Sequence, residues 1–187
     1  VSGAVRTTPV YPQLKWVKAH GMKADVIIGT KTKATLILED MIKEYADNLL
    51  VCTDDGSYGM HGLVTDAIKH LVEQKQQKYD EVVAIGPMIM MKFVSLLTKE
   101  LGLKTTVSLN SLMVDGTGMC GACRVTIGGK TKFTCVDGPE FDAHLVDFDE
   151  AMRRQAMFKT HEIATDSKDH KCNLTAEVNH TIKRRRV

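Results

Sequence analysis

Short apolar runs alternate with helical patterns along the first half of the chain. Four runs rich in β-branched residues predict buried strands at residues 26–29, 49–53, 82–85 and 105–109. Around them, apolar positions at helical spacing predict helices over residues 11–20, 34–45, 63–74 and 88–101. Strands that alternate with helices favour an α/β fold with a parallel sheet covered on both faces.

The last of these predicted helices carries a clear apolar stripe. Its members are Ile89, Phe93, Leu96 and Leu97, which recur at spacings of three and four. We expect this face of the helix to be buried.

The opening of the chain lacks one expected element. Residues 2–5 have the pattern of a turn directly before the first helix, whereas a doubly wound sheet places a strand before such a turn. The chain also starts with Val1 rather than Met. We therefore expect a Rossmann-like parallel sheet whose first, central strand is missing together with anything upstream, which would leave open edges on the neighbouring strands.

A different pattern begins after Ser108. Glycines become frequent, the helical period stops, and three of the five cysteines fall within sixteen positions. The chain is thus predicted to divide into an α/β domain over residues 1–108, a small loop-rich module over 109–160, and a polar, flexible tail over 161–187.

Composition and charge narrow the function classes. The chain is 43% hydrophobic, yet it has no run near the roughly 18 uninterrupted apolar residues of a transmembrane helix. Up to Thr160 the basic and acidic residues balance at 19 each, which argues against a nucleic-acid-binding protein. The absence of a signal peptide and the odd number of cysteines indicate a reducing, cytoplasmic compartment and a metal or redox site.

The strongest chemical signal is the spacing of Asp115, Cys120, Cys123 and Cys135. With Asp115 as first ligand, this is the plant-type [2Fe–2S] pattern with its leading thiolate replaced by a carboxylate. Two ferric ions need four anionic donors, and a glycine-rich loop can wrap three of them around a cluster. A zinc site with the same residues, or a knuckle without metal, is the alternative.

A β-hairpin is predicted to bring the fourth ligand to the other three. A three-residue loop at residues 128–130 would place Cys123 opposite Cys135 and would sort apolar from polar positions. A two-residue Gly-Gly turn would instead pair Val125 with Lys132 and put the two cysteines on different faces. We therefore expect the three-residue loop.

Three glycine-containing turns stand where strands of the predicted sheet end. They are residues 2–6, followed by Thr7 and Thr8, residues 53–59, which include Asp54, and Gly86-Pro87. The carboxyl ends of parallel strands share one edge of the sheet, where open α/β folds bind ligands, and a helix start can hold a phosphate. Three such turns at one edge favour a nucleotide site.

Several motifs appear in the order found in one known family. They are Pro9-Val-Tyr-Pro-Gln13, Thr53-Asp-Asp-Gly-Ser-Tyr-Gly59, Ala84-Ile-Gly-Pro87, Val114-Asp-Gly-Thr-Gly-Met-Cys-Gly-Ala-Cys123, Cys135-Val-Asp-Gly-Pro-Glu-Phe-Asp142 and His144-Leu-Val-Asp-Phe148. Over about residues 1–159 the chain closely resembles the small flavoprotein subunit of sulfide dehydrogenase, also called NADH-dependent ferredoxin:NADP oxidoreductase. It is similar, less closely, to electron-transfer subunits of dihydroorotate dehydrogenase. Those subunits generally carry cysteine where Ile85 and Asp115 stand here, so both residues favour the first group.

The resemblance implies an electron-transfer function. A flavin-binding β-barrel would lie upstream of a NAD(P)-binding domain of the ferredoxin reductase type and a [2Fe–2S] module. Hydride would pass between NAD(P)H and FAD, and single electrons would leave through the cluster. They would go to a larger iron–sulfur flavoprotein subunit of a hetero-oligomer or to ferredoxin. Without the barrel, this chain alone would be inactive.

The resemblance also implies roles for individual residues. Asp115, Cys120, Cys123 and Cys135 would be cluster ligands, Gly86, Pro87 and Met88 would flank the nicotinamide, and Gly3, Thr7 and Thr8 would face the pyrophosphate. Lys31, where relatives often carry arginine, could reach a 2′-phosphate, so NAD and NADP both stay open. Ala4 and Arg6 replace glycines of the family's loop. A hypothesis of another class is a binding module in which a zinc knuckle supports a degenerate nucleotide fold; iron content and colour distinguish the two.

Overall fold

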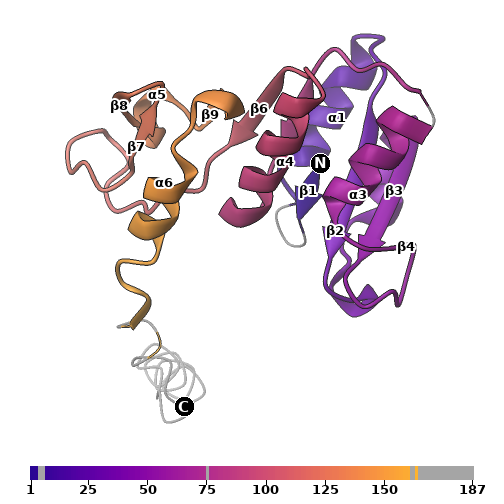
Figure 1. Ribbon diagram of the computed structural model, residues 1–187, viewed down its shortest axis with the longest axis horizontal. Helices are drawn as coiled ribbons and strands as arrows, with labels where there is room; N and C mark the ends of the chain where they lie inside the picture. The colour runs from indigo at the N-terminus through magenta and orange to yellow at the C-terminus, as the bar shows by residue number, and fades with distance from the viewer. Residues whose placement is uncertain (4–6, 75, 161–162, 164–187) are drawn as a thin grey trace, which may run out of the picture. The chain divides into compact units, whose positions relative to one another are not determined.

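The computed structural model describes residues 1–3, 7–74, 76–160 and 163 (Figure 1). Residues 1–154 form one compact unit and residues 155–187 a second. Ala4, Arg6 and most of the tail lie outside the described residues, so the predictions made for them stay predictions. No helix in the described part of the chain has the length and apolarity to cross a bilayer.

The first two thirds of the chain form strands and helices in alternation. The strands are β1 (Ser2–Gly3), β2 (Asp25–Thr30), β3 (Asn48–Thr53), β4 (Met60–His61), β5 (Val82–Ala84) and β6 (Thr105–Ser108). The helices are α1 (Val10–Ala19), α2 (Glu39–Tyr45), α3 (Val64–Lys69) and α4 (Met88–Glu100), with short turns η2 (Lys33–Thr35) and η3 (His70–Gln74). The helix predicted over residues 34–45 is thus split into η2 and α2, and the one over 63–74 ends in a π-helical turn.

The sheet is parallel through its centre. Strands β1, β2, β3 and β4 pair in that order, and β5 pairs with β6. A parallel bridge between Ser2 and Ile85 joins β1 to β5, so β1 lies between β2 and β5. The predicted α/β fold with a parallel sheet is confirmed.

The structure corrects the prediction for the opening residues. We expected a turn with no strand before it, but Ser2 and Gly3 form β1 and extend the ladders on both sides. The Val1 amino group donates to Val83 O at 2.7 Å, and Gly3 N donates to Ile85 O at 3.1 Å. The strand was missed because a serine and a glycine carry no apolar signal and two residues are too few to show a strand period.

Helices cover both faces of the sheet. On one face, Val10 and Leu14 of α1 and Ile42 of α2 pack with Val26 and Ile28. On the other face, apolar side chains of α3 and α4 pack with alternate residues of the same strands, such as Ile27 and Cys52. This alternation follows from the period of two in a strand.

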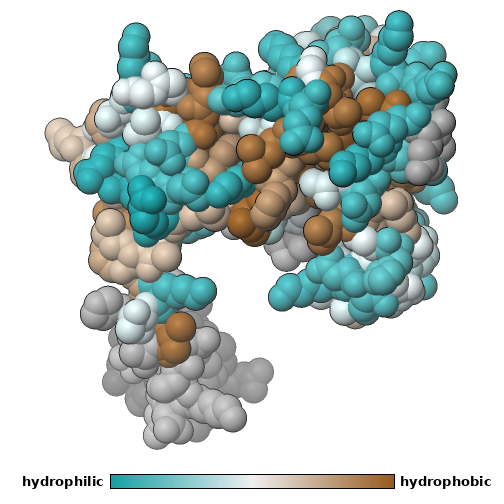
Figure 2. Space-filling view, in the orientation of Figure 1, coloured by the Kyte–Doolittle hydropathy of each residue, from teal (hydrophilic) through white to brown (hydrophobic). Residues whose placement is uncertain are grey.

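The buried face predicted for α4 is wrong. Ile89, Phe93 and Leu96 are about half exposed, at 49%, 52% and 50%, and only Leu97 of the predicted stripe is buried. The buried face instead carries Met88, Met91 and Val94 beside Leu97. Ser95 and Thr98 are buried on it as well, because their hydroxyl groups hydrogen-bond within the core. In Figure 2, apolar surface gathers over α4.

The last part of the described chain is a hairpin with short flanking elements. These are β7 (Arg124–Ile127), β8 (Lys130–Phe133), α5 (Thr134–Asp137), β9 (Glu140–Asp142), η4 (Ala143–Leu145) and α6 (Phe148–Gln155). Strand β9 pairs antiparallel with β6, so this part extends the main sheet. Val125, Ala143 and Phe148 belong to the same core as α3 and α4.

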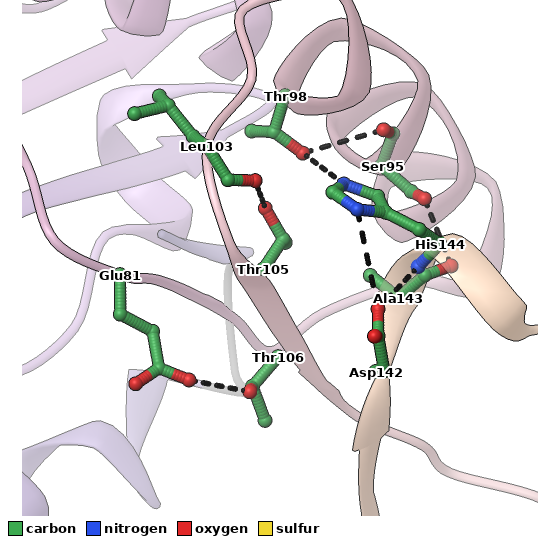
Figure 3. A network of polar contacts seen from close by, with 9 residues as sticks. All are labelled: Glu81, Ser95, Thr98, Leu103, Thr105, Thr106, Asp142, Ala143 and His144. Atoms are coloured by element: carbon green, nitrogen blue, oxygen red, sulfur yellow. Dashed lines mark hydrogen bonds and ion pairs between the residues drawn. The ribbon is translucent and has the colours of Figure 1, made fainter.

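A polar network also joins η4 to α4 (Figure 3). Ser95 donates its hydroxyl to Ala143 O at 2.9 Å, and Thr98 Oγ1 lies 3.2 Å from His144 Nε2. The backbone N–H of His144 donates to Asp142 at 2.9 Å. These contacts fix the segment after β9 against the helix that starts at Gly86-Pro87.

Candidate functional site

The hairpin has a different register from the one predicted. Arg124 pairs with Phe133 and Val125 with Lys132, so the turn contains two residues, Gly128 and Gly129. Both have positive φ, 55° and 75°. A two-residue turn of this kind matches the twist of the strands and needs glycine-like residues at both positions, so it forms in preference to a three-residue loop that would require a left-handed lysine.

The two cysteines nevertheless meet. Cys123 Sγ and Cys135 Sγ lie 3.3 Å apart, in hydrogen-bond contact. The hairpin does not pair them; the chain leaves β8 at once and turns into α5, which carries Cys135. Thr134 holds this turn, because its hydroxyl donates to Cys123 O at 2.9 Å.

Asp137 closes the α5 turn from the other side. Its carboxylate accepts the Phe133 N–H at 2.7 Å and pairs with Lys132 Nζ at 3.1 Å. These two contacts hold the pKa of Asp137 below its ordinary value, the backbone hydrogen bond being the larger cause. The carboxylate is therefore charged at neutral pH and anchors the turn that presents Cys135.

The pKa values of the two thiols move apart. Burial of Cys123 would raise its pKa, but hydrogen bonds from the Cys135 backbone and thiol outweigh burial and lower it. The pKa of Cys135 is raised, chiefly by its hydrogen bond to Cys123. Two thiols that share a proton behave in this way, and a metal ion would replace that proton.

The loop before Cys123 is shaped by three glycines. Gly116, Gly118 and Gly121 all have positive φ, between 65° and 86°. At Gly118 the space is limited as well, since a Cβ there would lie 2.6 Å from Val136 Cγ2. The loop therefore passes close to the segment that carries Cys135.

Asp115 and Cys120 lie on the exposed part of this loop. Asp115 accepts hydrogen bonds from the backbone N–H and the hydroxyl of Thr117, which hold the pKa of its carboxyl below the ordinary value. Cys120 Sγ accepts the Ala122 N–H at 3.5 Å. Of the four predicted ligands, the structure brings Cys123 and Cys135 together, and no group of three metal-ligating side chains is assembled among the described residues.

The donor set fits an iron–sulfur group in its chemistry. Two thiols on one tetrahedral metal lie about 3.8 Å apart for metal–sulfur bonds near 2.3 Å, close to the 3.3 Å between Cys123 and Cys135. One backbone N–H, that of Ala122, points at the sulfur of Cys120, and a glycine-rich loop leads into the pair. Hydrogen bonds to sulfur are a general feature of such sites.

Large apolar side chains surround this loop and lie in solvent. They are Met113, Val114, Met119 and Val136, with exposed fractions of 50%, 72%, 90% and 62%. We call these four residues the apolar rim. Contiguous exposed apolar side chains of this kind mark interaction surfaces.

The second candidate site lies at the carboxyl edge of the sheet. The chain leaves β1 toward β2 and later returns to β5 on the other side of β1, so β1 and β5 form the switch point where open sheets bind ligands. Gly3 and Gly86 meet there, since a Cβ on Gly3 would lie 2.8 Å from Pro87 Cδ and one on Gly86 3.3 Å from Gly3 N. The two predicted glycines are therefore brought together, and both are buried under the start of α4, where Pro87 and Met90 fill the space that a Cβ would take.

The other predicted nucleotide residues divide into three groups. Lys31 and Asp54 are exposed directly after β2 and β3 at the same edge, and Asp54 N donates to Thr30 O at 3.1 Å. Thr8 and Pro87 are exposed as well.

Thr7 and Met88 are both buried. Thr7 Oγ1 contacts Ser2 Oγ at 3.2 Å, and the Met88 side chain belongs to the core. Neither side chain faces the edge, so only their backbones are available to a ligand there.

Sequence reasoning missed one residue beside the cysteine loop. Arg154 of α6 donates its Nη2–H to Ala122 O at 3.0 Å. Its only signal in the sequence is a basic residue near a helix C-terminus, which is common because it complements the helix dipole. His144, by contrast, belongs to one of the motifs named in the sequence, and its contact with Thr98 links η4 to α4.

Comparison with known proteins agrees with this geometry. Residues 110–147 match the family model for the iron–sulfur cluster binding domain of dihydroorotate dehydrogenase B. This range includes all four predicted ligands and the apolar rim.

Longer similarities cover most of the chain. A protein from the adh 3′ region of Clostridium beijerinckii, described as uncharacterized, is 62% identical over 87% of this chain and 55% of its own length. A Thermotoga maritima homolog of the dihydroorotate dehydrogenase B (NAD(+)) electron transfer subunit is 50% identical over 87% of this chain and 56% of its own length. The chain thus spans just over half the length of these relatives.

One solved structure is similar over the same range. It is described as giving insights into flavin-based electron bifurcation via the NADH-dependent reduced ferredoxin-NADP oxidoreductase. It matches with a TM-score of 0.79 and 48% identity over 87% of this chain and 58% of that one. The chain is therefore homologous to electron-transfer subunits of oxidoreductases and contains an iron–sulfur cluster binding domain.

Proposed function

We propose that this homologue of electron-transfer subunits carries a [2Fe–2S] cluster and relays electrons between a nicotinamide nucleotide, a flavin and a redox partner. The observation that carries the proposal is the contact of Cys123 and Cys135 at 3.3 Å inside a region that matches an iron–sulfur binding domain. The two cysteines flank the open end of the hairpin, and besides the contact of their sulfur atoms the N–H and the hydroxyl of Thr134 donate to Cys123 O at 3.2 and 2.9 Å. A purely structural hairpin has no need of such a contact.

The ligands would be Asp115, Cys120, Cys123 and Cys135. When bound, a [2Fe–2S] cluster supplies a site that takes up and releases one electron at a time. The chain's own part is to hold two thiolates close together, to direct a backbone N–H at sulfur, and to present a carboxylate that is already charged at neutral pH. The exposed position of Asp115 and Cys120 places the outer half of such a site next to solvent or a partner.

The nucleotide would bind at the carboxyl edge of β1 and β5. The turns at Gly3 and Gly86 are packed together at this edge, and the first N–H groups of α4, which have no partner within the helix, could bind a phosphate or a nicotinamide. Lys31 is exposed at the same edge and could pair with a 2′-phosphate, so both NADH and NADPH are candidates. FAD would be held mainly by a domain that corresponds to the part of the relatives that this chain does not match.

The apolar rim would receive the redox partner. Its four exposed side chains belong to the cysteine loop and to α5, which carries Cys135, so a subunit that covers them would also approach the cluster and exclude water from it. A larger iron–sulfur flavoprotein subunit fits this surface better than a soluble ferredoxin does. A permanent partner is expected to bury apolar residues, whereas a transient partner is expected to bind mainly through charged residues.

A related candidate follows from the family model. The matched domain is that of dihydroorotate dehydrogenase B, so the partner would be a flavin-containing dihydroorotate dehydrogenase subunit. Asp115 and Ile85 favour a ferredoxin:NADP oxidoreductase type of subunit instead, because the dihydroorotate dehydrogenase subunits generally carry cysteine at both positions. Addition of dihydroorotate to the assembled complex, with reduction of the cluster as readout, distinguishes the two.

The ligand set is tested by substituting one thiol of the pair. We expect Cys123→Ser to abolish visible absorption and to leave less than half of the bound iron, because a hydroxyl is a poor replacement for a thiolate. The α/β part should keep its circular dichroism spectrum. Cys52→Ala is the matched control, since Cys52 is a buried core cysteine away from the loop, and this variant should keep both colour and iron. Persisting absorption in Cys123→Ser would show that the ligand set is wrong.

A further inference from the structure

Arg154 reaches the loop between two of the proposed ligands from a different element. Its Nη2–H donates to the carbonyl oxygen of Ala122 at 3.0 Å, and Ala122 lies between Cys120 and Cys123. This is a charge-assisted hydrogen bond to the backbone of the Cys-Gly-Ala-Cys segment, and such bonds are about twice as strong as neutral ones.

The position of Arg154 is set by a helix that is fixed along its length. Asp147 caps α6, since its carboxylate accepts the Glu150 N–H at 2.9 Å, and its own N–H donates to Thr126 O at 2.9 Å. Ala151 is buried in the main core. Helix α6 is thus tied to β7 at its start, through Asp147 and Thr126, and to the loop before β7 near its end, through the Arg154 side chain and Ala122. The arginine is held at the loop by the fold rather than by chance surface packing.

The same guanidinium holds a donor that the polypeptide does not satisfy. The Nε atom of Arg154 is buried and has no hydrogen-bond partner among the residues that the structure describes. A buried N–H without an acceptor costs free energy, and most such groups in folded proteins are paired with protein, water or a bound group. The acceptor for this N–H is therefore absent from the described polypeptide.

We propose that Arg154 is a positioning residue for the cluster, which holds the cysteine loop through Nη2 and donates Nε–H to a sulfur of the bound cluster or of its thiolate ligands. The inference rests on the proposed function, because it needs the cluster. Four anionic ligands make the cluster negative, and reduction adds a further negative charge. A guanidinium beside it stabilises the reduced form more than the oxidised form and so raises the reduction potential.

The potential of the reconstituted full chain tests this role. Arg154→Met removes the positive charge and the N–H donors but keeps a side chain of similar length, whereas Arg154→Lys keeps the charge. The control is Arg153→Met, which removes a positive charge from the exposed neighbour on the last turn of α6. We expect Arg154→Met to make reduction at least tenfold less favourable, which is about 59 mV for a one-electron couple. Arg153→Met should match the wild type, and Arg154→Lys should lie between the wild type and Arg154→Met. Equal potentials in Arg154→Met and Arg153→Met would overturn the inference.

A spectroscopic measurement on the wild type does not depend on any variant's folding. With ¹⁵N only in the arginine side chains, pulsed EPR of the reduced chain should detect a weak ¹⁵N coupling. The coupling should persist in Arg153→Met and be absent from Arg154→Lys. An iron-loaded wild-type chain without this coupling overturns the role of Arg154 alone. A wild-type chain that takes up no iron overturns the proposed function together with it.

Discussion

Asp115, the proposed carboxylate ligand, already has a structural role in the loop. Its carboxylate already accepts two hydrogen bonds from Thr117, which lower its pKa and fold the start of the cysteine loop. A carboxylate kept charged in this way needs no further deprotonation to bind a ferric ion, and as a harder donor than thiolate it favours that ion.

Substitutions of Asp115 separate ligation from loop folding. We expect Asp115→Cys to keep a cluster with a changed reduction potential and visible spectrum, because it restores the all-thiolate ligand set. Asp115→Asn keeps the hydrogen-bond acceptor but removes the anion, and should retain less than half of the iron. A spectrum and potential unchanged in both variants would mean that Asp115 never contacts iron.

Cys52 is expected to behave as a core residue. Burial, and to a smaller extent the charges of Asp66 and Asp54, raise the pKa of its thiol to about 11. The nucleophilic thiolate is therefore scarce at pH 8 and increases only as the pH rises toward 11. Iodoacetamide labelling followed by peptide mass spectrometry should leave Cys52 unmodified at pH 8 in the folded chain and modified in urea. Equal labelling in both states would contradict its burial.

At the scale of elements, secondary structure was predicted correctly where the sequence favoured one structure, and wrongly where two features of the sequence favoured different structures. The strands around Ile27 and Val83 were predicted because short β-branched runs have few other structures available. The hairpin register was wrong because the pairing of apolar faces was weighed above turn chemistry, and the turn decided. The face of α4 was wrong because apolar residues stand on both sides of this helix, and the predicted stripe left out Met91 and Val94, which are the residues that the core buries.

The cysteine loop should depend on Gly118 more than on Gly116. Both have φ near 85°, so alanine at either position costs about 1–2 kcal/mol for the left-handed backbone. Only at Gly118 does the added Cβ also approach Val136, at 2.6 Å, whereas at Gly116 it meets open space. Gly118→Ala should therefore lose iron during gel filtration and melt at a lower temperature than Gly116→Ala. Equal losses in the two variants would indicate that only the backbone conformation matters.

At the scale of the whole molecule, the site-bearing part and the α/β part share one core. Strand β9 completes the sheet next to β6, and Phe148 packs into the cluster of side chains around α4. The sequence showed the change of pattern after Ser108 but could not show this pairing, because contacts between distant segments leave no local period. The predicted domain boundary there stays a prediction.

Phe148→Ala tests whether the two parts unfold together. Phe148 is 6% exposed, and removal of such a side chain costs about 3–5 kcal/mol. We expect the variant to lower the melting temperature of both parts in a single transition, recorded by circular dichroism for the sheet and by visible absorption for the cluster. Loss of colour well below an unchanged circular dichroism transition would show that the two parts are independent.

The proposed [2Fe–2S] cluster is best tested by the metal content and visible spectrum of the anaerobically purified chain. Such a cluster predicts about two irons and two sulfides per chain, with absorption between roughly 400 and 600 nm that decreases on reduction. A colourless protein with one zinc per chain would contradict it, because Cys123 and Cys135 would then belong to a structural knuckle that carries no electrons.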